Sequence, residues 1–220
     1  KIFLDMCSGV PRRRIAENLG VAKTTVDRRV SLLAERAKCK HYEALEQGSF
    51  KNLPVMMDEA IWHIHSKHKK VSICISTTCF AKPQIVSFSV KKTTQNSTAT
   101  ARRKYPEWLR RNEARLGIIK VCKELNQFIE PITIITDALE TYRAIIAEFL
   151  PNSVHYAVNI AQAETQEEKD LLWSVNLMIA KMRHDIGTMR RNTWITAKSI
   201  SAFEKQIWIY LAKVNGYKIF

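Results

Sequence analysis

The stretch PVMMDEAIWHIH (residues 54–65) places two acidic residues, Asp58 and Glu59, inside an apolar run. From Val55 onward the apolar residues recur towards every second position, which predicts a β-strand with a buried face. An unpaired charge in such a strand is costly unless a metal ion or another cation neutralises it. The stretch therefore predicts a first strand carrying a functional carboxylate, for which the alternative is an acid at the strand edge paired with a nearby Lys.

Further strands and helices follow in an informative order. Alternating apolar residues predict two more strands around 71–75 and 86–90, and the basic turn Ser66–Lys70 between the first two favours an antiparallel meander. Apolar spacing then predicts a long helix over 101–129, a buried strand over 132–136, a helix over 139–150, a short strand over 154–158 and a long helix over 167–189. This is the order of the ribonuclease-H-like fold, an α/β fold with a mixed sheet and helices on both faces.

A second acid closes the predicted fourth strand. Asp137 ends the run ITIITDAL (residues 132–139), 79 positions after Asp58. The first and fourth strands of a ribonuclease-H-like sheet are neighbours, so the two carboxylates are expected to meet at one metal site. Two divalent ions roughly 4 Å apart can activate a water or a 3′-hydroxyl at a phosphodiester, and hard oxygen ligands suit Mg²⁺ or Mn²⁺. The alternative for Asp137 is a helix N-cap.

The N-terminal part has the spacing of a helix-turn-helix. In RRRIAENLGVAKTTVDRRV (residues 12–30), Ala16 precedes Gly20 by four residues and Val26 follows it by six. The second helix of such a unit enters the major groove with its N-terminal residues. The candidates for DNA contact are Lys23, Thr24, Thr25, Arg28 and Arg29. The alternative is a three-helix packing element with solvated basic residues.

These patterns divide the chain into a helix-turn-helix domain over 1–38, a linker over 39–54 with weak periodicity, and a ribonuclease-H-like domain with basic C-terminal helices over 55–220. Lys and Arg total 35 against 21 Asp and Glu, a net charge of +14, which is the electrostatic signature of a nucleic-acid binder. A ribosomal or membrane-surface protein would share this excess. The 5 cysteines contain no Cys-x-x-Cys pair and are expected to be reduced.

The chain carries no run of eighteen apolar residues and no signal segment, so we expect a cytoplasmic, nucleoid-associated bacterial protein. It begins with Lys1 rather than Met. We therefore expect that a part of the protein upstream of Lys1 is missing.

Four segments together resemble the transposases of the insertion-sequence-one type over nearly the full length of the chain. Residues 3–30 are similar to the helix-turn-helix of that family. MMDE (56–59) with the basic turn after it, and IITDALETYR (134–143), are similar to the stretches that carry its first two catalytic aspartates. Residues 175–211 resemble the final helix and the basic segment behind it.

This resemblance implies metal-binding roles in Mg²⁺- or Mn²⁺-dependent cleavage and strand transfer for Asp58 and Asp137. It also implies that the last segment follows the third catalytic acid and holds transposon-end DNA, and the basic residues there are Arg183, Arg190, Arg191 and Lys198. The implied partners are double-stranded DNA, both transposon ends and target, and further copies of the chain in a homo-oligomer. A zinc-binding domain ahead of Lys1 is implied as well.

One position departs from the family pattern. When the last segment is aligned by Arg183 and Lys198, the third acid, a Glu, falls on Asn176. An amide oxygen can coordinate a metal but brings no charge and cannot act as a base. Either a neighbouring acid, Asp170 or Asp185, takes its place, or the chain is a catalytically weakened copy.

The function expected from the sequence is a DNA transposase of the DDE type. The rival is a transposase remnant that binds specific DNA without cutting it, which Asn176 favours. A nuclease acting on RNA hybrids is a third possibility, against which the helix-turn-helix counts, since that motif reads the B-form major groove.

Overall fold

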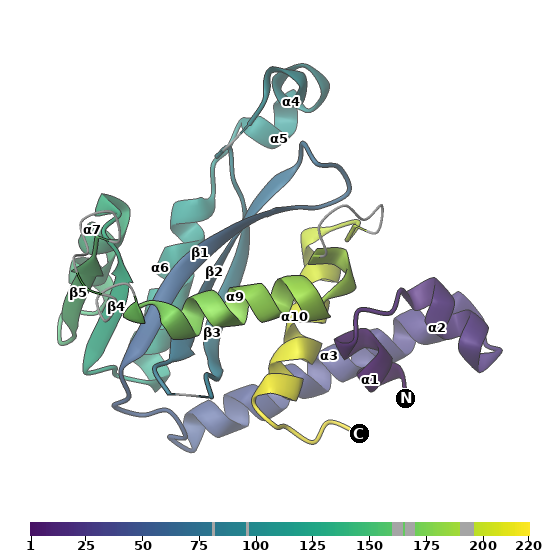
Figure 1. The fold of residues 1–220 in the computed structure, drawn as a ribbon, viewed down its shortest axis with the longest axis horizontal. Coiled ribbons are helices and arrows are strands. Elements are labelled where there is room, and N and C mark those ends of the chain that lie inside the picture. The colour runs from purple at the N-terminus through teal and green to yellow at the C-terminus, as the bar shows by residue number, and fades with distance from the viewer. Residues whose placement is uncertain (81, 96, 160–164, 166–169, 190–195) are drawn as a thin grey trace.

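The computed structural model describes residues 1–80, 82–95, 97–159, 165, 170–189 and 196–220. At its centre is a five-stranded sheet with the order β3-β2-β1-β4-β5 (Figure 1). The strands are β1 (Val55–His63), β2 (Lys70–Thr78), β3 (Ile85–Lys92), β4 (Thr133–Asp137) and β5 (Val154–Val158). β1, β2 and β3 form an antiparallel meander, whereas β4 runs parallel to β1 and β5 parallel to β4. This is the ribonuclease-H-like arrangement expected from the sequence.

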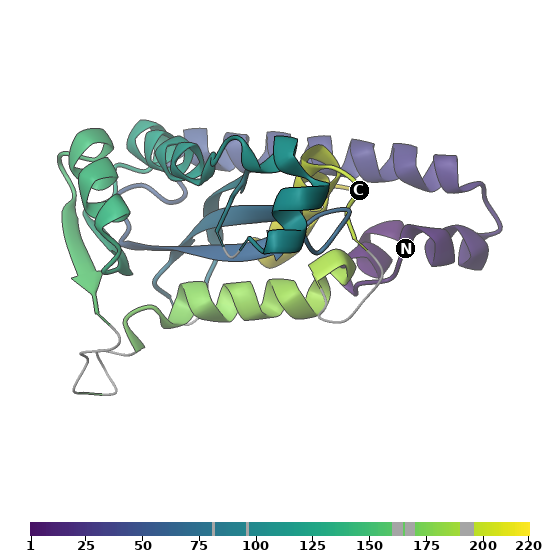
Figure 2. The same ribbon diagram turned by 90° about the horizontal axis from the view of Figure 1, so that it is seen from above.

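Two helical layers cover the faces of the sheet. On one face lie α9 (Trp173–Asp185) and α10 (Ile200–Val214), which share a core with the side chains of Met56, Ala60 and Trp62. On the other lie α6 (Ala114–Phe128) and α7 (Glu140–Phe149), packed on Val55 and Met57. Figure 2 shows the sheet between α9 and α6. Odd and even residues of β1 thus enter different cores, as the two-residue period of a strand requires.

The N-terminal segment, where a helix-turn-helix is expected, consists of three helices. They are α1 (Ile2–Cys7), α2 (Arg12–Leu19) and α3 (Lys23–Glu46). Gly20 ends α2 in the left-handed conformation, with φ 63°, and Ile15, Ala16 and Val26 are buried between α2 and α3. Glycine takes this conformation without the steric cost that a Cβ imposes.

α3 differs from the expected linker over 39–54 because it continues as helix to Glu46. Leu45 and Phe50 are buried in the core beneath α6, and the Tyr42 hydroxyl donates a hydrogen bond to Glu124 on that helix (3.0 Å). The apolar periodicity was weak there because a histidine, His41, occupies a buried position of the stripe between Ala37 and Leu45.

The helix expected over 101–129 is divided into α4 (Ala99–Lys104), α5 (Pro106–Leu109) and α6. Pro106 explains the first break, because the residue before a proline is disfavoured in the α region, and Tyr105 has φ −137° and ψ 54°. Before α6, the Asn112 side chain accepts a hydrogen bond from the Ala114 N–H (3.3 Å). The helix expected over 167–189 is helical as α9, followed by a 3₁₀ turn at Gly187–Met189, and residues 166–169 lie outside the described part.

The helix-turn-helix shares a hydrophobic core with the C-terminal part of the chain. Ile209 and Ala212 of α10 and Ile219 belong to the same buried cluster as Val26. The backbones of Gly9 and Gly187 approach so closely that a Cβ on Gly187 would lie 2.4 Å from the Gly9 carbonyl oxygen. No described helix has the length and apolarity needed to cross a membrane.

His41 joins α3 to two other parts of the molecule. Its Nε2 lies 2.9 Å from the Val86 carbonyl oxygen on β3, and its Nδ1 lies 3.1 Å from the Tyr217 hydroxyl. Burial lowers the pKa of His41 and outweighs the hydrogen bond to Val86 and the charge of Glu124, which raise it. The buried imidazole therefore favours the neutral state.

We expect His41 to make folding sensitive to acid. Because its folded pKa lies below the unfolded value of about 6.5, its contribution to stability is present above that pH and is lost as the pH falls towards the folded pKa. Replacing His41 by Gln should lower the melting temperature at pH 7.5, and the difference from wild type should shrink at pH 5.5. The exposed His65, changed to Asn, is the control. Equal differences at both pH values for His41→Gln would contradict this reading.

Candidate active site

The two acids singled out in the sequence lie on adjacent strands. The parallel register of β1 and β4 pairs Val55 with Ile134 and Met56 with Ile135. Continued by two residues, the same register brings Asp58 level with Asp137, the last residue of β4. Two acids that are distant in the sequence therefore lie side by side in the sheet, at the C-terminal end of β4.

The acid pair extends to a third carboxylate, that of Glu59. Side chains alternate along a strand, so Asp58 lies on the α9 face with Met56 and Ala60, while Glu59 lies on the α6 face. The Ser72 hydroxyl on β2 donates a hydrogen bond to the Glu59 carboxylate. The charge of Asp137 raises the pKa of both Asp58 and Glu59, so Asp137 acts on carboxylates on both faces of the sheet.

Burial and like charges make Asp58 hard to ionise. Burial is the main cause that raises its pKa to about 6, and the charges of Asp137 and Glu59 raise it further. The Glu59 N–H, which donates to Asp58 Oδ1 (2.6 Å), and the charge of Arg183 act in the opposite direction. Burial likewise raises the pKa of Glu59, partly offset by the bond from Ser72. Such clustered, partly buried carboxylates are typical of sites that bind a cation.

Tyr142 of α7 lies beneath these acids. Its side chain is 1% exposed, and its hydroxyl has no hydrogen-bond partner among the described residues. Burial raises its pKa well above the usual value, and the neighbouring Cys74, Glu59, Asp58 and Asp137 raise it further. The helical spacing of Tyr142 with Ile145 and Ile146 marks it as a core residue, but nothing local indicates that three carboxylates lie nearby.

Asp137 also begins the turn into α7, because its Oδ1 accepts a hydrogen bond from the Leu139 N–H (3.2 Å). Asp137 is not the N-cap of α7, which is Leu139, so the helix-cap alternative is wrong and the hydrogen bond belongs to the turn ahead of the helix. This hydrogen bond uses Oδ1 of Asp137, so Oδ2 is the oxygen that could bind a metal ion.

The donors at this site suit a hard divalent cation. Asp58 and Asp137 offer carboxylate oxygens, the ligands preferred by Mg²⁺ and Mn²⁺, and Mg²⁺ is usually bound by one or two carboxylates while it keeps several waters. Over the described residues, no group of three or more His, Cys, Asp and Glu side chains is arranged to hold a metal ion. Two carboxylates with like charges therefore form the donor set.

Asn176, the residue that the sequence places at the position of the third acid, is exposed on α9. It lies seven residues before Arg183, close to two helical turns, so the two side chains leave the same flank of the helix. Asp185, one of the two alternatives for the third acid, pairs with Lys213 (3.1 Å) and His184 (2.8 Å) at the other end of α9. Asp170 is exposed ahead of α9.

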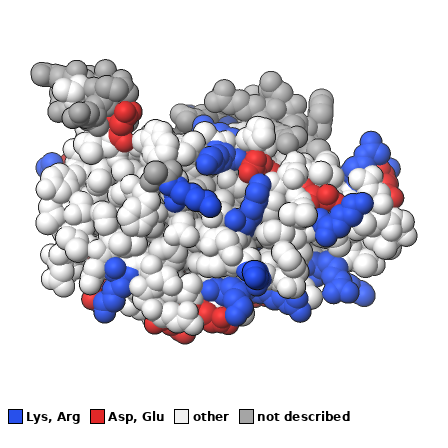
Figure 3. Space-filling view, turned by 60° about the horizontal axis from the view of Figure 1, so that its bottom comes forward, with Lys and Arg blue, Asp and Glu red and all other residues white. Residues whose placement is uncertain are grey.

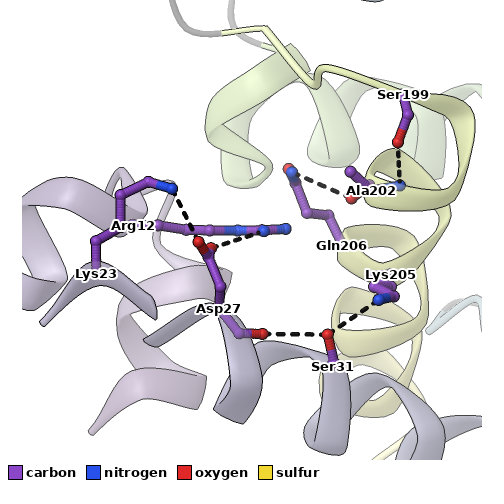
Figure 4. Close-up of polar contacts among 8 residues, drawn as sticks. All are labelled: Arg12, Lys23, Asp27, Ser31, Ser199, Ala202, Lys205 and Gln206. Atoms are coloured by element: carbon purple, nitrogen blue, oxygen red, sulfur yellow. Dashed lines mark hydrogen bonds and ion pairs between the residues drawn. The ribbon is translucent and has the colours of Figure 1, made fainter. Parts of the chain in front are cut away.

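The DNA-contact candidates of the helix-turn-helix lie at the exposed start of α3. Thr24, Thr25, Arg28 and Arg29 are exposed. Lys23 pairs with Asp27 (2.8 Å), which also pairs with Arg12 (3.1 Å) (Figure 4). Burial tends to raise the pKa of Asp27, but the hydrogen bonds from Lys23 and Arg12 lower it overall. Asp27 therefore holds α2 to α3 and restrains Lys23.

The neighbouring turn of α3 is tied to the C-terminal helix. Lys205 of α10 donates to the Ser31 hydroxyl (2.9 Å), and that hydroxyl donates to the Asp27 carbonyl oxygen (3.1 Å) (Figure 4). Figure 3 shows Lys and Arg side chains recurring across the side of the molecule turned towards the viewer, with acidic ones among them.

The C-terminal candidates for DNA contact are divided between surface and interior. Lys198 is exposed, whereas Arg183 is partly buried and its Nε has no hydrogen-bond partner among the described residues. The charge of Arg183 lowers the pKa of Asp58, so Arg183 lies within electrostatic reach of Asp58. Arg190 and Arg191 lie outside the described residues.

No protein-family model and no curated protein matches this chain. Among solved structures, the chain is similar to the catalytic domain of Mos1 mariner transposase, with 12% sequence identity and a TM-score of 0.34 over 86% of this chain and 90% of that one. A TM-score of this size says nothing about function.

The raised pKa of Asp58 predicts that this residue destabilises the folded protein at neutral pH. The folded value of about 6 exceeds the ordinary 3.8, so the stability that protonation provides is present below pH 3.8 and is lost as the pH rises through about 6. Asp58→Asn should therefore raise the free energy of unfolding at pH 7.5 by roughly 1–3 kcal/mol, and this gain should shrink at pH 4. Denaturant unfolding at both pH values measures it, with the exposed Glu148→Gln as control. A variant less stable than wild type at pH 7.5 would refute the account.

Proposed function

We propose that this chain is a DNA transposase of the DDE type, which cleaves phosphodiesters and transfers strands at insertion-sequence ends with the help of divalent metal ions. The observation that carries the proposal is the alignment of Asp58 with Asp137 on neighbouring parallel strands of a ribonuclease-H-like sheet. The exposed basic start of α3 and the net charge of +14 support DNA as the substrate.

In this proposal Asp58 and Asp137 bind Mg²⁺ or Mn²⁺ through their carboxylate oxygens. Such ions, when bound, supply the activation of a water or a 3′-hydroxyl and the stabilisation of the leaving oxygen. A pKa of about 6 leaves Asp58 mostly ionised at neutral pH, so it presents its charge to a cation. Arg183, close enough to lower that pKa, would donate to a phosphate oxygen of the substrate.

Duplex DNA would be held by Lys23, Thr24, Thr25, Arg28 and Arg29 of α3 in the major groove, with Arg183, Arg190, Arg191 and Lys198 contacting phosphates at the transposon end. Joining requires both ends of the element in one complex. We therefore propose that the active form is a homo-oligomer.

Removal of either aspartate should abolish strand transfer. A metal-bound transition state is worth several kcal/mol, so Asp58→Asn and Asp137→Asn should each reduce the joining of an end-containing duplex to a plasmid by on the order of 10²-fold or more. Glu148→Gln should retain activity. Mn²⁺ should raise the melting temperature of wild type but not of Asp137→Asn, which reports binding independently of catalysis. Joining that persists in both aspartate variants would rule out this site.

A second candidate function is favoured by Asn176: a remnant that binds specific DNA but no longer cuts it. If Asn176 holds the third-acid position, Asn176→Glu adds a carboxylate to the site. The Mn²⁺ concentration that half-saturates the protein should then fall by about tenfold, since one further charged ligand contributes at least 1.4 kcal/mol. Lys181→Glu, on a different flank of α9, is the control. Specific DNA binding without nicking, in wild type and in Asn176→Glu, would favour the remnant.

A further inference from the structure

A basic lobe projects from the end of the sheet where β1 and β2 are joined. We define it as the β1–β2 turn (residues 64–70) together with residues 98–115, which include α4 and α5. Figure 1 shows it at the top of the molecule, on the opposite side of the sheet from α3. Neither the helix-turn-helix nor the acid site accounts for this lobe.

The lobe is braced against the sheet by its own backbone and aromatic side chains. The Trp108 Nε1 donates to the Lys70 carbonyl oxygen (3.0 Å), and the Glu113 N–H donates to the Lys92 carbonyl oxygen (2.9 Å). The Lys92 ammonium lies 5.1 Å from the centre of the Trp108 ring, and Lys69 lies 4.9 Å from that of Tyr105. These cation–π contacts and hydrogen bonds hold α4 and α5 in place.

The outer surface of the lobe carries an excess of positive charge, because residues 98–115 hold six basic side chains and two acidic ones, Glu107 and Glu113. Six basic residues there are exposed, and none forms a salt bridge within the described part of the chain: Arg102, Arg103, Lys104, Arg110, Arg111 and Arg115. Elsewhere on the surface, exposed Arg13, Lys40 and Lys51 do pair with carboxylates. Gathered like charges repel each other, and a bound polyanion relieves that repulsion.

A cavity lies between the base of the lobe and Glu59. It has a volume of about 480 Å³ and is lined by Asn112 and Arg115 at the base of the lobe, and by Glu59 and Leu139 from the acid cluster. Leu139 is the residue whose N–H binds Asp137. The base of the lobe therefore lies next to the acids on the side of Glu59.

We propose that the basic lobe binds the phosphates of duplex DNA flanking the bond that is cut, as a contact surface separate from the helix-turn-helix. The inference rests on the proposed action of the chain on DNA. Six unpaired cations match a regularly spaced phosphate backbone. Tyr105 and Trp108 are engaged by lysines, which counts against a surface that stacks unpaired bases, and α4 and α5 present no exposed large apolar residue to insert into a membrane.

The test compares two triple variants with the same change in charge. Arg102→Gln/Arg103→Gln/Arg111→Gln removes three of the six exposed charges of the lobe, and Arg13→Gln/Lys40→Gln/Lys51→Gln removes the charges of three ion-paired residues elsewhere. Binding of a labelled duplex that extends on both sides of the transposon end is measured against salt concentration. Each lost phosphate contact lowers the slope of log affinity against log salt by about 0.9, so the lobe variant should lose about 2–3 from the slope and about tenfold or more in affinity at low salt. Lysines in the same three positions should restore both.

Other outcomes separate this inference from the proposed function. If wild type binds and joins DNA while the lobe variant matches the control variant in slope and affinity, the lobe inference is wrong and the transposase proposal stands. If wild type shows no salt-dependent binding to the duplex, both fail. Binding to vesicles of anionic lipid that is lost in the lobe variant, with DNA binding unchanged, would also overturn the inference.

Discussion

The parallel pairing of β1 with β4 is the constraint on which the rest of the structure depends. It aligns Asp58 with Asp137, so the charge of Asp137 adds to the burial that raises the pKa of Asp58. A slip of one residue would turn the side chains of β4 to the other face and separate the acids. The apolar residues on both faces, Met56 beneath α9 and Met57 beneath α6, make such a slip costly.

Much of this arrangement follows from local sequence. The two-residue period identified the meander, and acids inside apolar strands identified Asp58 and Asp137, because an unpaired buried charge is unfavourable without a functional reason. Other features depend on tertiary contacts that have no local signal. The continuation of α3 to Glu46 uses a buried His41, the burial of the Tyr142 hydroxyl depends on the packing of α7, and the effect of Arg183 on Asp58 depends on how α9 crosses β1.

Asp58 and Glu59 are consecutive, so a strand must send them to opposite faces of the sheet. Asp137, the last residue of β4, acts on the ionisation of both. The acid cluster therefore has two sides. The α9 side lies within reach of the charge of Arg183, and the α6 side borders the cavity that reaches Arg115.

The N-terminal helices are joined to the rest of the molecule in two ways. The backbone of Gly9 approaches that of Gly187, and α3 packs at one end in the N-terminal core and at the other in the core beneath α6. Under the proposed function, this limits the distance between the DNA sequence that is recognised and the bond that is cut. If a flexible linker joined the recognition helices to the acid site, cleavage could occur at many distances from the recognised sequence. In this chain the N-terminal helices and the sheet that carries the acids are joined through shared hydrophobic cores. The structure of the protein would then fix the number of base pairs between the recognised sequence and the cleaved bond.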